Sequence, residues 1–263
     1  MQSPWCDVLL SGDQKLTKAS HNHRRALAAA AATARIRARL GGDPHAEFLL
    51  PSLSIIDRLR GRPWKASRPE AQAALCRSHY FDDTLKRFLS ASETGQIVLL
   101  EGRYDTRPWR FSEALKGRKM FARSDKDYPG RITVRPDIAL SSALRAAGCK
   151  ATERTLFLWE GGSMLNSRAE VKATLSAIRS MSGAGSMLVL DCWSLSHLQS
   201  RARLLGQPVR FAIHPEDLSG LLARMGFEVI DIADAEELRR RFPSPGLQAS
   251  SPCFVVTARL NAL

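Results

Sequence analysis

The feature that most constrains the fold of this chain is a regular alternation of short apolar runs with helical patterns after Gly95. The apolar runs are bounded by Gly, Pro or charged residues and occur at 96–101, 119–124, 131–135, 155–159, 187–191, 228–232 and 254–258. Segments with helical spacing at 141–147, 168–181 and 215–225 lie between several of them. Strands that alternate with helices build a mainly parallel sheet covered by helices. We therefore predict an α/β fold with a mostly parallel, seven-stranded sheet.

The first ninety residues have a more helical character. Residues 21–40 are rich in Ala, Leu and Arg and contain neither Gly nor Pro, which favours a helix. Residues 41–44 break it, 61–69 form a polar loop, and apolar positions within 69–89 again fall at helical spacing. We predict an N-terminal helical cap over 1–90 and an α/β core over 91–263, together one compact domain. The connection 243–252, rich in Pro, Ser and Gly, favours a last strand that returns as a hairpin at a sheet edge.

The cysteines and the apolar segments argue against a metal protein and a membrane protein. The cysteines lie far apart, without a Cys-x-x-Cys pair or clustered histidines; they are Cys6, Cys76, Cys149, Cys192 and Cys253. We expect reduced, mostly buried thiols and no metal site. The N-terminus lacks a basic and then apolar leader, and no stretch reaches the ~20 apolar residues of a membrane helix. We expect a soluble, cytoplasmic protein.

The chain is strongly basic. Lys and Arg total 39 against 26 Asp and Glu, which gives a formal charge of +13. Such a charge attracts nucleic acid, anionic membranes or acidic partners. The basic residues are scattered and are not interleaved with aromatic residues as in a platform for single-stranded nucleic acid. We interpret them as a solvated basic surface without a specific nucleic-acid motif, and keep charge-driven nucleic-acid association as an alternative.

Acidic residues follow four of the expected strands. They are Glu101 and Asp105 after the first strand, Asp125 after the second, Asp137 after the third and Glu160 after the fourth. In an open parallel sheet, ligands bind at the carboxyl ends of the strands. A single acid at such a position is most often a helix cap or a solvated loop residue. Several on one edge indicate a ligand-binding cleft.

The segment 96–111 carries a more specific pattern: an apolar strand, then Asp105-Thr-Arg107, then Trp109-Arg-Phe111. Upstream lie Thr33-Ala-x-x-Arg37 and a segment 77–83 that begins with Arg77. Further matching segments follow at 135–137, 155–161, 185–191, 206–208 and 226–229. In this order and spacing, the series resembles the leucine carboxyl methyltransferase family over about residues 25–260.

The resemblance implies a Rossmann-like class I methyltransferase fold and S-adenosylmethionine as cofactor. It implies methyl transfer to oxygen, on a carboxylate or hydroxyl of a small molecule or of a protein C-terminus. A carboxylate acceptor needs no general base, whereas an alcohol needs one. Two histidines, His79 and His214, have no partner that the sequence reveals, so we assign no base.

The resemblance also implies roles for individual residues. Arg77 would bind the methionine carboxylate of the cofactor, and Asp105 would lie beside the methionine moiety. Asp137 would accept a hydrogen bond from the adenine amino group, and Glu160 would lie close to the methyl-transfer site. Gly102 and Asp125 complete the expected cofactor site. The alternatives are a surface Arg77, a capping Asp105 and a Glu160 paired with a core arginine.

Three departures from the family pattern support a second hypothesis. Glu101 and Arg103 replace the two glycines of a Gly-x-Gly turn, where larger side chains would crowd the cofactor. Arg123 stands near the position where the family has the carboxylate that holds the ribose hydroxyls, and the segment that begins at Glu160 lacks the family's tyrosine. The alternative is therefore an inactive or repurposed binding or regulatory module, in which Arg103 and Arg123 would favour a phosphate or carboxylate ligand.

Overall fold

The computed structural model describes residues 33–34, 36–37, 43–49, 68–195, 203–204, 207–243 and 251–261. These residues form a three-layer α/β arrangement around one seven-stranded sheet. The strand order is β3-β2-β1-β4-β5-β9-β8, and every neighbouring pair is parallel except those of β9. The strands are β1 (Gln96–Leu99), β2 (Lys119–Arg123), β3 (Ile132–Val134), β4 (Thr155–Trp159), β5 (Met187–Trp193), β8 (Phe227–Ala233) and β9 (Cys253–Leu260). A separate two-stranded ribbon pairs β6 (Arg203–Leu204) with β7 (Gln207–Pro208).

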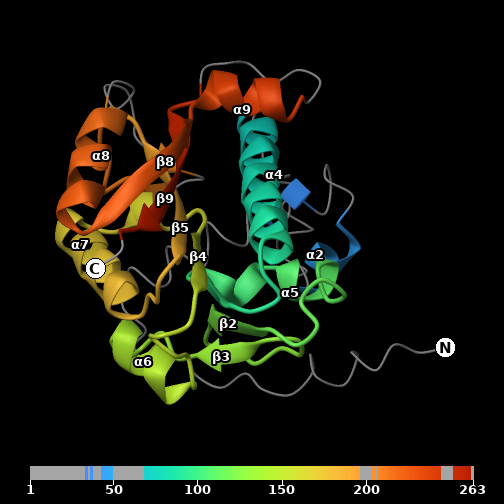
Figure 1. Ribbon diagram of the computed structural model, residues 1–263. Helices are drawn as coiled ribbons and strands as arrows, with labels where there is room; N and C mark the ends of the chain where they lie inside the picture. The colour runs from blue at the N-terminus through green and yellow to red at the C-terminus, as the bar shows by residue number, and fades with distance from the viewer. Residues whose placement is uncertain are drawn as a thin grey trace.

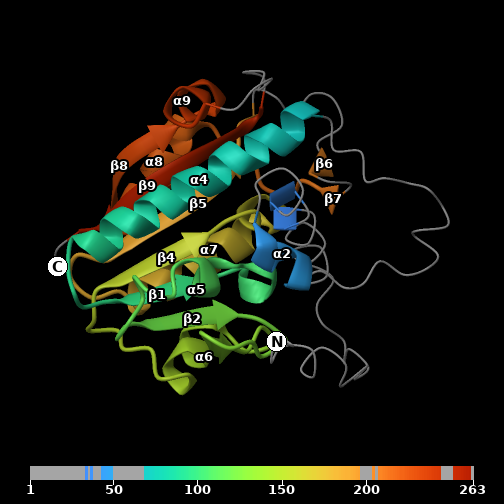
Figure 2. The same cartoon turned by 90° about the vertical axis from the view of Figure 1, so that its right-hand side faces the viewer.

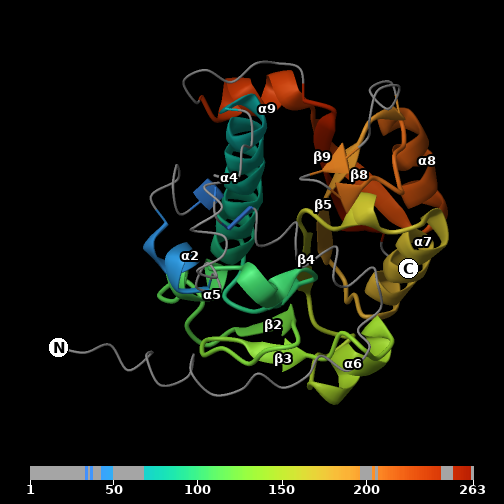
Figure 3. The same ribbon diagram turned by 180° about the vertical axis from the view of Figure 1, so that it is seen from behind.

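Helices cover both faces of the sheet. Figure 1 and Figure 3 show α4 (Arg68–Ser90) on one side, with α6 (Leu140–Ala146), α7 (Arg168–Ser180) and α8 (Pro215–Arg224) on the other. In Figure 2 the same long α4 runs across the sheet below α9 (Ala235–Arg241). The short helices α2 (Pro44–Leu49) and α5 (Arg107–Arg110) lie below α4 in both Figure 1 and Figure 2. In the described ranges, no helix combines the length and the apolar character needed to cross a bilayer.

The central strand β1 shows why the sheet is covered on both faces. All four of its residues are buried. Because successive side chains of a strand point to opposite faces, Ile97 and Leu99 pack under α4, whereas Val98 packs with the α6–α8 layer. A strand buried on both faces reads as a continuous apolar run. This explains why 96–101 could be recognised in the sequence.

Helix α4 is fixed to the sheet by a polar contact as well as by apolar packing. Its buried face includes Phe81 and Leu85, each fully buried. The hydroxyl of Tyr80 donates to Asp231 on β8 at 2.7 Å and lies 2.8 Å from the Thr257 hydroxyl on β9. The anchored helix carries Arg77 and Asp82 toward the carboxyl ends of the strands.

The predicted elements agree closely with the observed ones. The seven expected strands and the helices predicted within 69–89, 141–147, 168–181 and 215–225 are present, with shifts of a few residues at the ends. Residues 33, 34, 36 and 37 are helical, and the rest of the helix expected over 21–40 lies outside the described residues. The sequence did not predict α5 and α9. The division between a cap and a core at residue 90 stays a prediction.

One expectation about topology was wrong. The last strand, β9, does form an antiparallel hairpin with β8, but it lies between β5 and β8 and not at the sheet edge. Strand β8 is the edge strand. The burial of β9 explains the difference, since nearly all its residues are buried and only an inner position allows that.

The turn after β1 is held close to β2. A short 3₁₀ helix, η1 (Gly102–Tyr104), follows Glu101. A Cβ atom at position 102 would lie 2.6 Å from the Cβ atom of Ala122, so only glycine allows this approach. The turn therefore depends on the small side chains of Gly102 and Ala122.

We expect Gly102→Ala to lower the free energy of unfolding by about 1–3 kcal/mol because of this overlap. Adding Ala122→Gly should recover part of the loss, and urea unfolding of both single variants and the double variant measures the coupling. Gly220→Ala is the matched control, because only the end of the Arg224 side chain lies near that position in α8. Equal losses in Gly102→Ala and Gly220→Ala would contradict this account.

Candidate functional site

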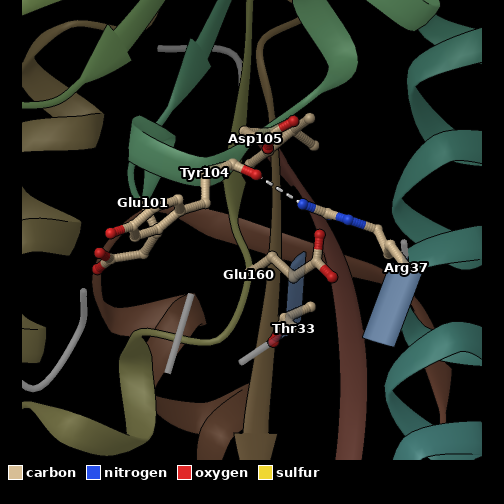
Figure 4. A pocket seen from close by; sticks show the side chains of 7 residues that line it. Thr33, Arg37, Glu101, Tyr104, Asp105 and Glu160 are labelled. Atoms are coloured by element: carbon tan, nitrogen blue, oxygen red, sulfur yellow. Dashed lines mark hydrogen bonds between the residues drawn. The ribbon is translucent and has the colours of Figure 1, made fainter. Parts of the chain in front are cut away.

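The candidate site lies at the carboxyl ends of β1 and β4, where the resemblance places a cofactor. A small cavity of about 20 Å³ opens there, enough for roughly one or two water molecules. Its lining comprises Thr33, Arg37, Glu101, Tyr104, Asp105, Leu158 and Glu160. Figure 4 shows the side chains of Arg37, Asp105 and Glu160 close together, with Glu101 set apart from them. Most of the lining is polar or charged.

The Arg107 side chain, fully buried, is the centre of the charges behind this cavity. Its Nη1 donates to Asp105 at 2.6 Å, its Nη2 to Glu160 at 2.6 Å, and its Nε to Asp82 at 2.7 Å. The guanidinium group also lies over the Phe81 ring, 5.7 Å from its centroid. One arginine thus joins carboxylates from α4, from the turn after β1 and from the end of β4.

Further arginines extend these contacts into a connected network. Arg110 pairs with Asp82 and lies 3.4 Å from Asp43. Arg77 is 4% exposed, and its Nε lies 3.1 Å from Asp191 and 3.8 Å from Glu160. We call this set the arginine–carboxylate network; it comprises Arg37, Arg77, Arg107, Arg110, Asp43, Asp82, Asp105, Glu160 and Asp191.

The network keeps most of its carboxylates ionised. Burial by itself raises the pKa of Glu160, but the charges of Arg107, Arg37 and Arg77 outweigh it and lower this pKa to about 2. Burial likewise acts to raise the pKa of Asp82, and Arg107 and Arg110 bring it below its ordinary value. These carboxylates are therefore negative at neutral pH.

Asp191 is a partial exception. Burial raises its pKa to about 6, because Arg77 and backbone hydrogen bonds offset only part of the desolvation and Glu160 adds repulsion. Its carboxylate accepts hydrogen bonds from the Gly161 amide at 2.9 and 3.0 Å. Asp191 thereby fixes the turn that follows β4 and carries Glu160.

Glu101 is the acid of the cavity that no arginine holds directly. Within the described part of the chain, no ion pair forms to its carboxylate. Burial has the largest effect and raises the pKa of Glu101 to about 7. The charge of Asp191 acts in the same direction, whereas the Arg123 charge and a hydrogen bond from the Trp159 side chain act to lower this pKa. The carboxylate packs on Gly162, and a side chain at that position would overlap with it.

On the side of the site toward β2 and β3, two arginine side chains connect the turn after β1 to neighbouring loops. Arg103 forms a close ion pair with Asp125 across the cleft between the first two loops. Arg131 donates to the Gly102 carbonyl and lies 4.6 Å from the centroid of the Tyr128 ring. In this conformation the turn after β1 is therefore tied to the loop after β2.

The structure brings together four of the six residues that the sequence singled out. Arg77, Asp105 and Glu160 belong to one network, and Gly102 lies in the turn beside them. Asp125 lies across the cleft on Arg103. In the part of the chain that the structure describes, Asp137 pairs with its neighbour Arg135 alone, has a side chain 58% exposed, and is not part of the network.

The sequence reasoning gave no role to several network members, although most lie inside the segments it quoted. Arg107 ends the Asp-Thr-Arg motif, Asp82 lies in the segment that starts at Arg77, and Asp191 lies within β5, at the end of the strand expected over 187–191. Arg37 belongs to the N-terminal motif. A charged residue inside an otherwise buried motif was the available signal for each of them.

Comparison with known proteins supports the resemblance. The family model described as leucine carboxyl methyltransferase matches residues 23–122, which include Arg37, Arg77, Asp82, Asp105 and Arg107. The match ends before Asp125, Asp137 and Glu160. No curated protein matches the sequence.

Solved structures resemble the fold. A protein assigned as a methyltransferase from Thermobifida fusca YX matches with a TM-score of 0.57 and 12% identity, over 74% of this chain and 84% of that one. The CurJ carbon methyltransferase matches with a TM-score of 0.50 and 14% identity, over 92% of this chain and 68% of that one. The predicted Rossmann-like class I methyltransferase fold is thus confirmed.

We expect Arg107→Met to lower the free energy of unfolding by about 3–5 kcal/mol, because the buried carboxylates that contact Arg107 would lose the cation that they share. Arg87→Met is the control: Arg87 pairs with Asp83 on the same helix, but its side chain is 73% exposed. Its loss should stay below about 1 kcal/mol. Urea unfolding measures both, and a similar loss in the two variants would mean that the network stabilises little.

Glu101 should make stability depend on pH in a specific direction. Its pKa rises from 4.5 to about 7 on folding, so the folded state prefers the neutral form and loses stability as pH rises between these values. In Glu101→Gln this loss is absent. Relative to the wild type, the variant should gain about 2–3 kcal/mol between pH 4 and pH 8.5, measured by urea unfolding.

The matched control for this comparison is Glu113→Gln, whose carboxylate is 83% exposed and pairs only with Lys116. Its unfolding free energy should run parallel to the wild type over the same pH range. If the Glu101→Gln curve also ran parallel, Glu101 would have an ordinary pKa in the folded protein.

Proposed function

We propose that this chain binds S-adenosylmethionine at the carboxyl ends of β1 and β4 and transfers its methyl group to an oxygen nucleophile. The observation that carries the proposal is the convergence of Arg77, Asp105 and Glu160 around Arg107, at the edge where open α/β sheets bind ligands. Two of these residues and Arg107 lie in the segment that the family model matches.

The charge of the site suits a cationic ligand. The arginine–carboxylate network holds five carboxylates, from Asp43, Asp82, Asp105, Glu160 and Asp191, against four guanidinium groups, from Arg37, Arg77, Arg107 and Arg110. S-adenosylmethionine carries a net positive charge through its sulfonium group. A buried excess of negative charge stabilises such a ligand far more than exposed carboxylates would.

Two buried nitrogen atoms also remain available for hydrogen bonds. Among the described residues, Nε of Arg37 and Nε of Arg77 have no hydrogen-bond partner, although Arg77 lies in ion-pair range of Asp191. Buried donors without partners are rare and point to a missing acceptor. The carboxylate of the cofactor is an acceptor of the required kind, and Arg77 would bind it while remaining close to Asp191.

The adenosine side has to open before the cofactor can bind. A cavity of about 20 Å³ holds water, whereas sites for ligands of this size measure roughly 300–1,000 Å³. The ion pair between Arg103 and Asp125 ties the turn after β1 to the loop after β2, and both side chains retain some exposure, 16% and 17%. A partly exposed pair costs little to separate. Release of Arg103 would free Asp125 for the ribose side of the cofactor.

When bound, the cofactor supplies an electrophilic methyl group. The residues of this chain would orient it: Arg77 at the carboxylate, Asp105 beside the methionine moiety, Asp137 at the adenine and Glu160 near the reacting centre. Positioning and charge supply most of the rate of such displacements. The rigid network around Arg107 favours a fixed geometry for Asp105 and Glu160.

A second candidate is a relative that binds another ligand and does not catalyse. The arginine bridges from Arg103 and Arg131 onto the turn after β1 favour it, because they close the adenosine side and place cations there. Phosphate or a carboxylate would then bind in place of the cofactor. Inorganic phosphate added to the calorimetric experiment below tests this candidate directly.

Titration calorimetry with S-adenosylmethionine and S-adenosylhomocysteine tests the proposal. We expect micromolar dissociation constants, and binding up to about fivefold tighter in Arg103→Ala because no ion pair then has to separate. Arg259→Ala removes an exposed pair with Glu228 on the far side of the sheet and should leave the affinity unchanged. If neither the folded wild type nor folded Arg103→Ala gave binding heat at millimolar ligand, binding of the cofactor would be excluded and the second candidate would be favoured.

A further inference from the structure

Glu101 contributes a further carboxylate to the lining of the proposed site. Glu101 lies two residues after the end of β1 and lines the same cavity as Asp105 and Glu160. Its carboxylate rests on Gly162, two residues beyond Glu160 in the turn after β4. Glycine at 162 leaves the space that the Glu101 side chain occupies, so the two turns fit together around this carboxylate.

Glu101 differs from its acidic neighbours in what holds it. Asp105 and Glu160 each receive a hydrogen bond from Arg107 at 2.6 Å. Glu101 has no such partner in the described ranges, and the Trp159 side chain is the hydrogen-bond donor that acts on it. Among the acids of the cavity, Glu101 is therefore the one placed to gain and lose a proton.

The electrostatic surroundings agree with that role. Charged groups near Glu101 come from several elements: Arg123 on β2, Asp191 on β5, Glu160 after β4, Asp105 after η1, and Arg37. Burial raises the pKa of Glu101 to about 7, so both protonation states are populated at neutral pH. A general base is most effective when its pKa lies near the working pH.

We infer that Glu101 is the general base of the site and that the methyl acceptor is a hydroxyl group. This inference rests on the proposed function and narrows its acceptor. The acceptor O–H bond breaks and its proton passes to the Glu101 carboxylate. A new O–CH₃ bond forms as the S–CH₃ bond of the sulfonium breaks, and sulfur keeps the electron pair. The products are a methyl ether, S-adenosylhomocysteine and a protonated Glu101.

The charge of the site also argues against a carboxylate acceptor. A carboxylate would enter a cavity lined by Glu101, Asp105 and Glu160, next to a network with more carboxylates than guanidinium groups. Like charges in a poorly solvated site repel strongly. A neutral hydroxyl avoids this repulsion and donates its proton to Glu101.

Proton-linked calorimetry tests the inference without an acceptor. The protein is titrated with S-adenosylmethionine and, separately, with S-adenosylhomocysteine at pH 7, in two buffers of different ionisation enthalpy. The sulfonium charge should drive the proton from Glu101, releasing up to about half a proton with the methionine form and less with the homocysteine form. Glu113→Gln should behave as the wild type, and Glu101→Gln should lose this difference.

Each outcome separates the inference from the proposed function. If both ligands bind and the proton counts of Glu101→Gln equal those of the wild type, Glu101 is not the proton-carrying group, while cofactor binding stands. If neither ligand binds to folded protein, the proposed function fails and this inference fails with it. Proton release in the wild type that disappears only in Glu101→Gln supports the inference.

A matched pair of small probes tests the acceptor class. Phenol and benzoate are titrated at pH 8 into the protein saturated with S-adenosylhomocysteine. Phenol should bind at least tenfold more tightly than benzoate, and Glu101→Gln should remove most of that preference because the charged acceptor for the hydroxyl is gone. Benzoate binding as tight as phenol, no phenol binding, or a preference unchanged in Glu101→Gln would overturn the hydroxyl assignment.

Discussion

The burial of Arg107 is the interaction on which this structure depends. A guanidinium group without solvent exposure is tolerated only because carboxylates surround it, and here they come from α4, the turn after β1 and the end of β4. Removing Arg107 would leave these buried carboxylates without their shared cation, so this one side chain holds the three segments together. The same contact that assembles the fold at this edge of the sheet therefore sets the geometry of Asp105 and Glu160.

The network also explains why the acids of the cavity behave differently. Glu160 is surrounded by Arg107, Arg37 and Arg77, which keep its pKa low despite burial. Glu101 enters the same region from the turn after β1 but reaches no guanidinium group in the described residues, so desolvation decides its pKa. Glu101 stands where the family pattern implied by the resemblance has glycine. Its side chain thus places a titratable group where the proposed reaction would need one.

The two sides of the site differ in how firmly they are held. Toward β4 and β5, fully buried charges and the amide of Gly161 fix the turn that carries Glu160. Toward β2 and β3, the partly exposed pair between Arg103 and Asp125 closes the cleft. Partly exposed ion pairs contribute little to stability, whereas buried ones are costly to break. Opening for a cofactor is therefore expected on the adenosine side, with the reacting side unchanged.

The sequence by itself determined the alternating strands and helices, because each buried strand and each amphipathic helix shows its periodicity locally. It also singled out Asp105 and Glu160, since residues that follow strands face one edge of a parallel sheet, and Arg77 through the resemblance of its segment to a family motif. Only the tertiary structure decided that β9 lies inside the sheet, because strand order depends on pairing between distant segments. It alone showed that Arg107 links Asp82, Asp105 and Glu160 and that Glu101 stays unpaired, because burial and charge contacts arise only when segments far apart in the chain meet.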